Sequence, residues 1–275
     1  MVSQEQRRRQ LAREKFLRQQ QRRTSARRKA RMRNSVIASV LGVVVIGSVA
    51  LYTTGVLKND DDKASNAGSK VTPSASAAPS KAPDPCEKPD KGAVEKLSWK
   101  KEPAMTIDKS AKYTMKLATT CGDIDIALKS SAAPHTVNSF DFLAGKGYFD
   151  HTKCHRLTTN GIYVLQCGDP TGTGSGGPGY TIPDENLKDK SLKANVYPTG
   201  TIAMANTGQK HTGGSQFFLV YQDSQLPPSY TPFGTVDAAG LKVLKKIAAA
   251  GESTGQGDGA PNATVVINKA TVTKS

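Results

Sequence analysis

The pattern of hydrophobic and polar positions divides this chain into four parts. Residues 1–34 carry scattered apolar side chains with no repeating period, and residues 35–57 are mostly Val, Ile, Leu, Ala and Gly without a single charge. Residues 58–98 are polar and rich in Pro, Ser and Ala. From there to the end, short alternating apolar stretches and two stretches with helical spacing indicate a folded domain. This domain, 99–275, has an ordinary size for a single hydrophobic core.

The domain is predicted to consist mainly of strands, with two helices. Pro134 opens the first helix, which has Val137, Phe140 and Leu143 on one side, and Gly251 follows the last turn of the second. Strands are expected where apolar and polar residues alternate, at residues 113–119, 124–128, 154–158, 162–167, 201–206, 215–221, 264–267 and 271–273.

One predicted hairpin, residues 154–167, gathers side chains that could act together. Arg156 alternates with His155, so the guanidinium faces away from that neighbour. Val164 and Gln166 share one face of the return strand, so a cation, an amide and an apolar group can meet on one surface. Taken alone, each of these residues also has an ordinary explanation as a core or exposed position of a strand.

Several short motifs occur in a fixed order along the domain. His155-Arg156, the run 166–169, Met204-Ala205-Asn206 and the run 214–218 together resemble the signature of the cyclophilins, the cyclosporin-type peptidyl-prolyl cis-trans isomerases. The resemblance extends from about residue 112 to residue 272. It implies a mainly β fold, an eight-stranded antiparallel β-barrel capped by two α-helices. In this chain the barrel is expected to follow one transmembrane helix, which the apolar stretch 35–57 predicts. It also implies rotation of Xaa-Pro peptide bonds, a reaction that breaks no bond and needs no cofactor or metal.

The resemblance assigns roles to a small set of residues. Arg156 and Gln166 would be catalytic: the guanidinium would donate to the prolyl nitrogen or the nearby carbonyl as amide resonance is lost, and Gln166 would bond the carbonyl side. The pocket for the proline ring would be formed by Tyr163, Val164, Phe218 and Leu226. Ala205, Thr212 and Gln216 would line the neighbouring groove, and Asn206 would pair through its backbone with the extended peptide. Tyr230 is the remaining predicted substrate-binding residue.

The chain departs from the family pattern at several places, and Tyr163 and Val164 replace the usual Phe and Met. The turn between Arg156 and Tyr163 is longer than the familiar one, Gln225 stands where many members carry Trp, and Tyr230 where many carry His. Because that Trp contributes a donor and an aromatic face to cyclosporin, we expect weak inhibition by this ligand, and nanomolar inhibition would contradict it. The same departures leave open a second function, a weakly catalytic or non-catalytic peptide-binding or chaperone module on this fold.

Positive charge is concentrated at the N-terminus. The formal net charge is +15, and residues 1–34 contain a dense run of Lys and Arg with only Glu5 and Glu14 against it. Residues 35–57 are long enough to cross a bilayer as a helix, so we expect an uncleaved signal anchor with the basic arm in the cytoplasm. A cleaved signal peptide is the alternative, but its positive and apolar regions are normally shorter. The arm is expected to contact anionic lipid, whereas no aromatic interleaving or known module supports nucleic-acid binding.

Residues 58–98 are predicted to be a disordered linker, because their composition is too polar to bury a core. The domain would then lie outside the cytoplasmic membrane on a flexible tether. Its partners there would be unfolded or newly exported chains that contain proline, and a monomer is expected. A third possibility is that the basic arm is the functional end and the domain is carried along with it.

The cysteines and histidines complete the candidate chemistry. Four cysteines on the predicted external side could form disulfides, and three pairings are open. Strand alternation argues mildly against joining Cys154 to Cys167, because it places them on different faces unless a bulge intervenes. His155 is expected to be a buried, hydrogen-bonded core residue, and no two histidines have metal-ligand spacing. The remaining cysteines are Cys86 and Cys121.

Overall fold

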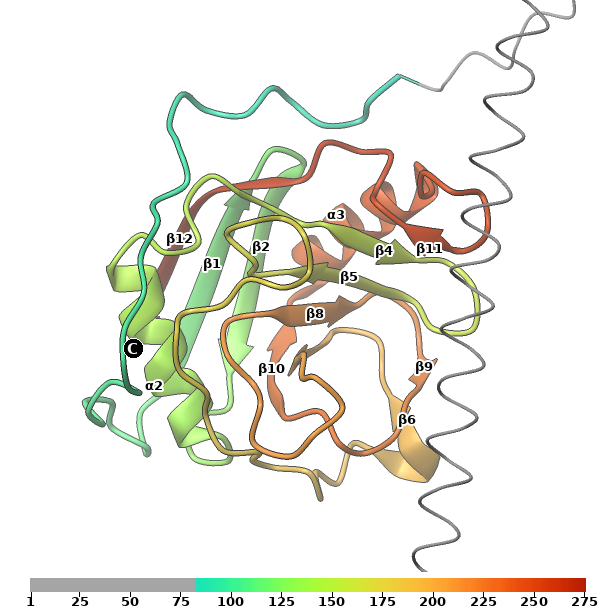
Figure 1. The fold of residues 1–275 in the computed structure, drawn as a ribbon. Helices are drawn as coiled ribbons and strands as arrows, with labels where there is room; N and C mark the ends of the chain where they lie inside the picture. Colours follow the sequence, from blue (N-terminus) through green and yellow to red (C-terminus); the bar gives the residue numbers. More distant parts are fainter. Residues whose placement is uncertain (1–82) are drawn as a thin grey trace, which may run out of the picture. The chain divides into compact units, whose positions relative to one another are not determined.

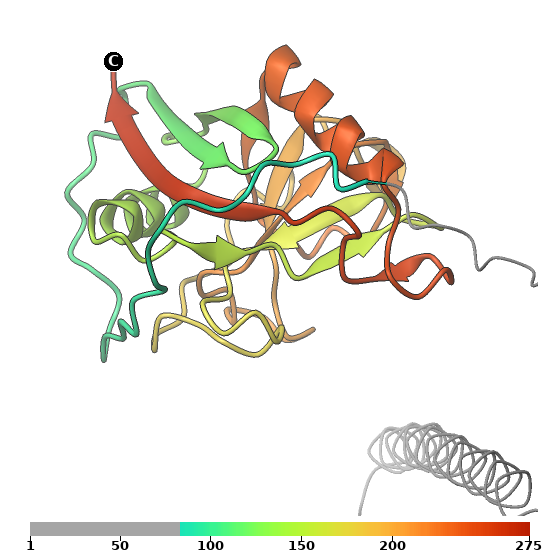
Figure 2. The ribbon, with the colours of Figure 1, turned by 90° about the horizontal axis from the view of Figure 1, so that it is seen from above.

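The computed structural model describes residues 83–275, which form a curved sheet with two α-helices packed on it (Figure 1, Figure 2). The main sheet has ten strands in the order β11-β4-β5-β8-β7-β10-β2-β1-β12-β3, and β6 pairs with β9 in a second sheet. The helices are α2 (Pro134–Gly145), α3 (Ala238–Ala249) and the 3-10 helix η1 (Lys193–Asn195). The strands are β1 (Tyr113–Thr119), β2 (Gly122–Leu128), β3 (Thr152–Lys153), β4 (Arg156–Thr158), β5 (Val164–Cys167), β6 (Val196–Tyr197), β7 (Thr201–Met204), β8 (Phe217–Val220), β9 (Ser224–Gln225), β10 (Pro232–Val236), β11 (Asp258–Gly259) and β12 (Val266–Lys274).

The strand arrangement corrects the expectation of an eight-stranded barrel. Four of the observed strands, β3, β6, β9 and β11, are two-residue pairings of loop segments, which alternation over a longer stretch cannot reveal. The predicted strands 264–267 and 271–273 join in the single strand β12, and β10 has no counterpart among the predicted strands. The two ends of the main sheet, β11 and β3, are not paired with each other, so the sheet is a half-barrel.

The predicted hairpin at the start of the domain and both helices are confirmed. In β1 and β2 buried apolar residues alternate with more exposed, mostly polar residues, as the period of two requires. Pro134 occupies the first turn of α2, where its missing N–H costs nothing. The carboxylate of Asp237 accepts the backbone N–H of Gly240 at 2.6 Å and caps α3, and Gly251 follows that helix with φ 74°. Helix α2 packs against β12, and α3 packs against β2.

Buried apolar residues form two clusters on the two sides of β5, β7 and β8. The larger cluster includes Phe140, Phe217 and Phe233, with ring centroids of Phe140 at 5.6 Å from Phe217 and 4.6 Å from Phe233. The smaller cluster includes Phe218. Because neighbouring residues of a strand point to opposite faces, β8 contributes one phenylalanine to each cluster. The members of the smaller cluster are Val164, Tyr197, Ala203, Phe218 and Val220.

Residues 83–111, which are called the arm below and are distinct from the basic arm 1–34, run along the outside of the domain and beside β12 (Figure 2). A disulfide joins Cys86 to Cys121, and the backbone N–H of Glu87 donates to the carbonyl of Thr120 at 2.8 Å. Farther on, the ring of Trp99 packs against Phe142 with a centroid distance of 5.0 Å. Residues 83–98, which the sequence places in the linker, therefore lie on the domain surface.

The second disulfide joins Cys154 to Cys167, so the argument from strand alternation against this pair is wrong. Strand β4 begins only at Arg156, and the backbone at Cys154 bonds instead to the carbonyl of Val265 at 3.0 Å. The N–H of His155 donates at 3.1 Å to the carbonyl of Gln166, which is also the partner of Arg156. Two residues therefore face one at this edge of the ladder, and Cys154 does not follow the period of two that applies within the strand. The two Cα atoms lie 4.0 Å apart.

The described part of the chain contains no helix long and apolar enough to cross a membrane. The predicted transmembrane helix, residues 35–57, lies outside the described residues, as do the basic arm 1–34 and the first part of the predicted linker.

Candidate active site

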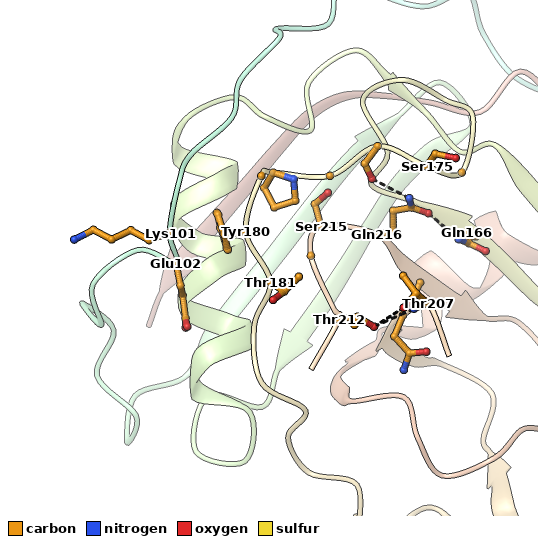
Figure 3. Close-up of a pocket in the computed structure, with 18 of the residues that line it drawn as sticks. Lys101, Glu102, Gln166, Ser175, Tyr180, Thr181, Thr207, Thr212, Ser215 and Gln216 are labelled. Carbon is orange, nitrogen blue, oxygen red and sulfur yellow. Dashed lines mark hydrogen bonds between the residues drawn. The ribbon is translucent and has the colours of Figure 1, made fainter. Parts of the chain in front are cut away.

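Arg156 and Gln166 face each other across the β4–β5 ladder. They are direct partners in its register, and Arg156 Nη1 donates to Gln166 Oε1 at 3.2 Å. Gln166 Nε2 in turn donates to Gln216 Oε1 at 2.9 Å, and Gln216 Nε2 donates to the carbonyl of Gly176 at 2.9 Å (Figure 3). This chain of hydrogen bonds fixes the orientation of both amides. The cation and amide predicted from the hairpin therefore do meet on one surface.

Asp258 holds the other edge of the guanidinium, a contact that no sequence pattern indicated. Arg156 Nε donates to Asp258 Oδ1 at 2.7 Å and Nη2 donates to Oδ2 at 2.8 Å. The hydrogen bonds to this carboxylate raise the pKa of Arg156, so its charge is secure. The side chain of Arg156 is 37% exposed and therefore remains accessible to a bound molecule.

Four residues predicted for the apolar pocket separate into two groups. Val164 and Phe218 are buried in the smaller cluster, and Leu226 packs against it, as does Tyr230 with its ring centroid 5.4 Å from Phe218. Tyr163 lies elsewhere: its ring centroid is 6.0 Å from Tyr221, and it packs against the larger cluster. The physical reason is strand parity, since Tyr163 is adjacent to Val164 and faces the other way. The residue that packs beside Val164 instead is Ile162.

Figure 3 shows a pocket of about 1100 Å³. It lies beside the smaller cluster, because Ala205 lines the pocket and also packs against that cluster. Its lining includes four predicted substrate-binding residues, Ala205, Asn206, Thr212 and Gln216, together with Gln166. The hydroxyl of Thr212 accepts the N–H of the residue that follows Asn206, at 3.1 Å, and so shapes the loop at the pocket edge. The other walls are formed by the glycine-rich loop 174–181 and by residues 100–102 of the arm.

The arm reaches this wall through close backbone contacts. The N–H of Trp99 donates to the carbonyl of Pro178 at 2.8 Å. Gly179 has φ 88°, and a Cβ there would lie 2.6 Å from the carbonyl oxygen of Trp99. Only glycine allows the loop and the arm to approach so closely. The predicted packing of Trp99 on the domain exterior thus helps to position one side of the pocket.

Asp169 organises the same glycine-rich loop from within. Its side chain is fully buried, and the carboxylate accepts backbone N–H groups of Thr171 at 2.7 Å, Thr173 at 3.1 Å, Gly174 at 2.6 Å and Ser175 at 3.0 Å. Burial alone would raise the pKa of Asp169, but hydrogen bonds from the loop outweigh it and lower the pKa to about 2. The ionised carboxylate is therefore the form that the folded loop binds.

Acid should release this interaction. The pKa of Asp169 falls from 3.8 to about 2 on folding, so its contribution is complete above pH 3.8 and is lost as the pH falls through 2. We expect the carboxylate to contribute about 2 kcal/mol to the free energy of unfolding at pH 5. Between pH 5 and pH 2 the free energy of unfolding, measured with urea, should fall by about 2 kcal/mol more in the wild type than in Asp169→Asn. Equal losses in the two proteins would contradict this role.

His155 differs from its expectation as a hydrogen-bonded core residue. Both of its ring nitrogens are buried, but neither has a hydrogen-bond partner among the described residues. Burial lowers the pKa of His155, so the neutral ring fits its surroundings. Within residues 83–275, no group of His, Cys, Asp and Glu is arranged to hold a metal ion.

Comparison with known proteins gives matches over this same region. The profile of the family described as cyclophilin type peptidyl-prolyl cis-trans isomerase/CLD matches residues 114–272. A curated protein named probable peptidyl-prolyl cis-trans isomerase B from Mycobacterium leprae is 52% identical over 165 residues, covering 57% of this chain and 56% of that protein. Its namesake from Mycobacterium tuberculosis is 49% identical, covering 57% and 53%. The chain thus spans about half the length of these two relatives.

Two further matches cover most of a shorter protein. Peptidyl-prolyl cis-trans isomerase B of Bacillus subtilis is 40% identical over 125 residues, which cover 45% of this chain and 82% of that protein. Among solved structures, a cyclophilin type peptidyl-prolyl cis-trans isomerase of Cryptosporidium parvum matches with a TM-score of 0.50 and 27% identity. That match covers 60% of this chain and 99% of the other.

Proposed function

This chain belongs to the cyclophilin-type peptidyl-prolyl cis-trans isomerases, and on that basis we propose that its domain catalyses rotation of Xaa-Pro bonds in extended or unfolded polypeptides. The observation that carries the proposal is the pairing of Arg156 with Gln166 beside the cluster of Val164 and Phe218. A charged donor, an oriented amide and an apolar surface are what recognition of a prolyl peptide bond requires.

Rotation about an Xaa-Pro bond is accelerated by stabilisation of the twisted amide. Resonance opposes rotation with a barrier of about 18 to 20 kcal/mol, and no covalent bond has to break. An acceleration of about 10⁵ would need only about 7 kcal/mol of preferential binding of the twisted state. Arg156 can supply part of it by donating to the prolyl nitrogen, whose lone pair becomes available when resonance is lost, or to the adjacent carbonyl.

The surrounding residues would hold the peptide in place for this step. The proline ring would rest on Val164 and Phe218, with Leu226 and Tyr230 at the side, while Ile162 takes the place expected for Tyr163. The neighbouring pocket would take the chain next to the prolyl bond. Its predicted contacts are Gln166, Ala205, Asn206, Thr212 and Gln216.

We further propose that residues 35–57 anchor the protein as a single membrane span. The basic arm 1–34 would remain in the cytoplasm near anionic lipid, and residues beyond 57 would lie outside the cytoplasmic membrane. The two disulfides support an extracytoplasmic setting, because such bonds persist in oxidising compartments. The domain would then assist folding of exported chains as a monomer. Protease added to cells whose cytoplasmic membrane is intact should degrade the domain and leave cytoplasmic proteins intact. A domain that is degraded only together with cytoplasmic proteins would contradict this topology.

A non-catalytic peptide-binding module is the second candidate. It is favoured by the departures from the family pattern at the turn after Arg156, at Gln225 and at Tyr230. The deciding measurement is cis-trans exchange of an Ala-Pro peptide by NMR with the purified full-length chain. We expect exchange much faster than the spontaneous rate, which takes tens of seconds or more. Peptide binding without acceleration would establish the module instead.

A further inference from the structure

We propose that Asp258 is a positioning residue of this active site, which aims the guanidinium of Arg156 at the prolyl bond. This inference rests on the proposed isomerase function and deepens it. Asp258 lies on β11, and its side chain makes two hydrogen bonds to Arg156, at 2.7 and 2.8 Å. No role for this residue follows from the motifs that carry the family resemblance.

The geometry of the guanidinium supports a positioning role. The group has five N–H donors in a rigid plane. Asp258 takes the two donors on the Nε–Nη2 edge and Gln166 takes one on Nη1, so both ends of the plane are fixed. The donors that remain are one on each Nη nitrogen, and these can reach a bound peptide. An Arg side chain held only by Gln166 would keep much of its rotamer freedom.

The loop that carries Asp258 is itself well organised. Glu252, only 7% exposed, accepts hydrogen bonds from the N–H of Thr254 at 2.6 Å, from its hydroxyl at 2.7 Å and from the N–H of Gly257 at 2.8 Å. Glu252 also bridges to Pro261, and the N–H of Ser253 donates to the carbonyl of Ala260 at 2.9 Å. Asp258 therefore projects from a closed loop whose shape does not depend on the ion pair.

The same loop contacts the turn that is longer here than in the family pattern. Asp258 is paired with Thr158 in the β11–β4 ladder, and the N–H of Thr159 donates to the carbonyl of Gly257 at 2.9 Å. A Cβ on Gly257 would lie 2.5 Å from Cβ of Asn160. The extended turn after Arg156 thus provides the surface on which the loop that carries Asp258 rests.

A carboxylate beside a catalytic cation has two opposing effects. It reduces the positive field that the substrate feels, and it lowers the freedom of the donor that must be aligned. The pair is partly exposed, with 37% of the Arg156 side chain and 56% of the Asp258 side chain accessible, so water already weakens the field effect. Alignment depends on direct hydrogen bonds and is not weakened in the same way. We therefore expect a net gain from the pair.

The test compares full-length wild type with Asp258→Ala and Asp258→Asn in the Ala-Pro exchange assay. Asp123→Ala is the matched control, because Asp123 forms an ion pair with Lys116 at 2.6 Å and its side chain is 54% exposed, but it lies on β2. We expect kcat to fall about tenfold in Asp258→Ala with little change in KM, and less in Asp258→Asn, which keeps one acceptor. Asp123→Ala should match the wild type.

A second readout follows the Arg156 side chain directly. In ¹⁵N-edited NMR spectra, the Nε–H of Arg156 should give a signal protected from exchange in the wild type and in Asp123→Ala, and should lose that protection in Asp258→Ala. Unchanged or raised kcat in Asp258→Ala, with an active wild type, would overturn the positioning role. An inactive wild type would overturn the proposed function as well, so the two failures are distinct.

Discussion

Arg156→Ala should lower kcat/KM for an Ala-Pro peptide by roughly 10²- to 10³-fold, the loss typical for removing one donor that stabilises developing charge. The substitution removes the only cation that the structure places against Gln166 in the described residues. Its effect on the free energy of unfolding should stay within about 1 kcal/mol, because the pair with Asp258 is partly exposed. Exchange kinetics and urea unfolding of the same preparation check both expectations.

Two further variants sharpen this result. Arg156→Lys keeps the charge but cannot bind Asp258 in bidentate fashion while also reaching Gln166, so it should recover only a small part of the activity. Lys116→Ala removes a comparable exposed ion-paired cation at a distant site and should leave the activity unchanged. Wild-type activity in Arg156→Ala would show that catalysis, if present, does not depend on this guanidinium.

Removal of the disulfide between Cys154 and Cys167 should lower the free energy of unfolding by about 3 kcal/mol. The bond closes a segment of 13 residues, and the loss of chain entropy in the unfolded state accounts for that amount. The same bond joins the segments that carry Arg156 and Gln166, so the double variant Cys154→Ser/Cys167→Ser should also lose activity. Urea unfolding and the exchange assay measure the two effects.

The other disulfide is a natural control. Cys86→Ser/Cys121→Ser opens a larger loop of 35 residues, with an expected loss of about 4 kcal/mol, but this bond ties the arm to the β1–β2 turn and lies outside the Arg156–Gln166 ladder. Its removal should leave kcat close to that of the wild type. If both double variants lose activity equally, the bond between Cys154 and Cys167 has no special role at the site.

Periodicity predicted those parts of the fold that depend on neighbours along the chain. The β1–β2 hairpin, the start of α2 at Pro134 and the end of α3 near Gly251 follow from alternation, proline and glycine chemistry. The meeting of Arg156 and Gln166 on one surface follows from alternation as well, because alternate residues of each strand share a face; the register that pairs them was not predicted. Two-residue strands such as β11 carry no such pattern.

The sequence by itself determined the mainly β architecture with two helices and the family, and it predicted that Arg156 and Gln166 meet on one surface. Only the tertiary structure decided that Asp258, 102 residues away, binds Arg156, that Cys154 joins Cys167 and that Tyr163 packs away from the cluster of Val164 and Phe218. The physical reason is that a residue pattern reports which face of a local element is buried. Which distant segment covers that face depends on how the whole chain closes its loops and packs its core.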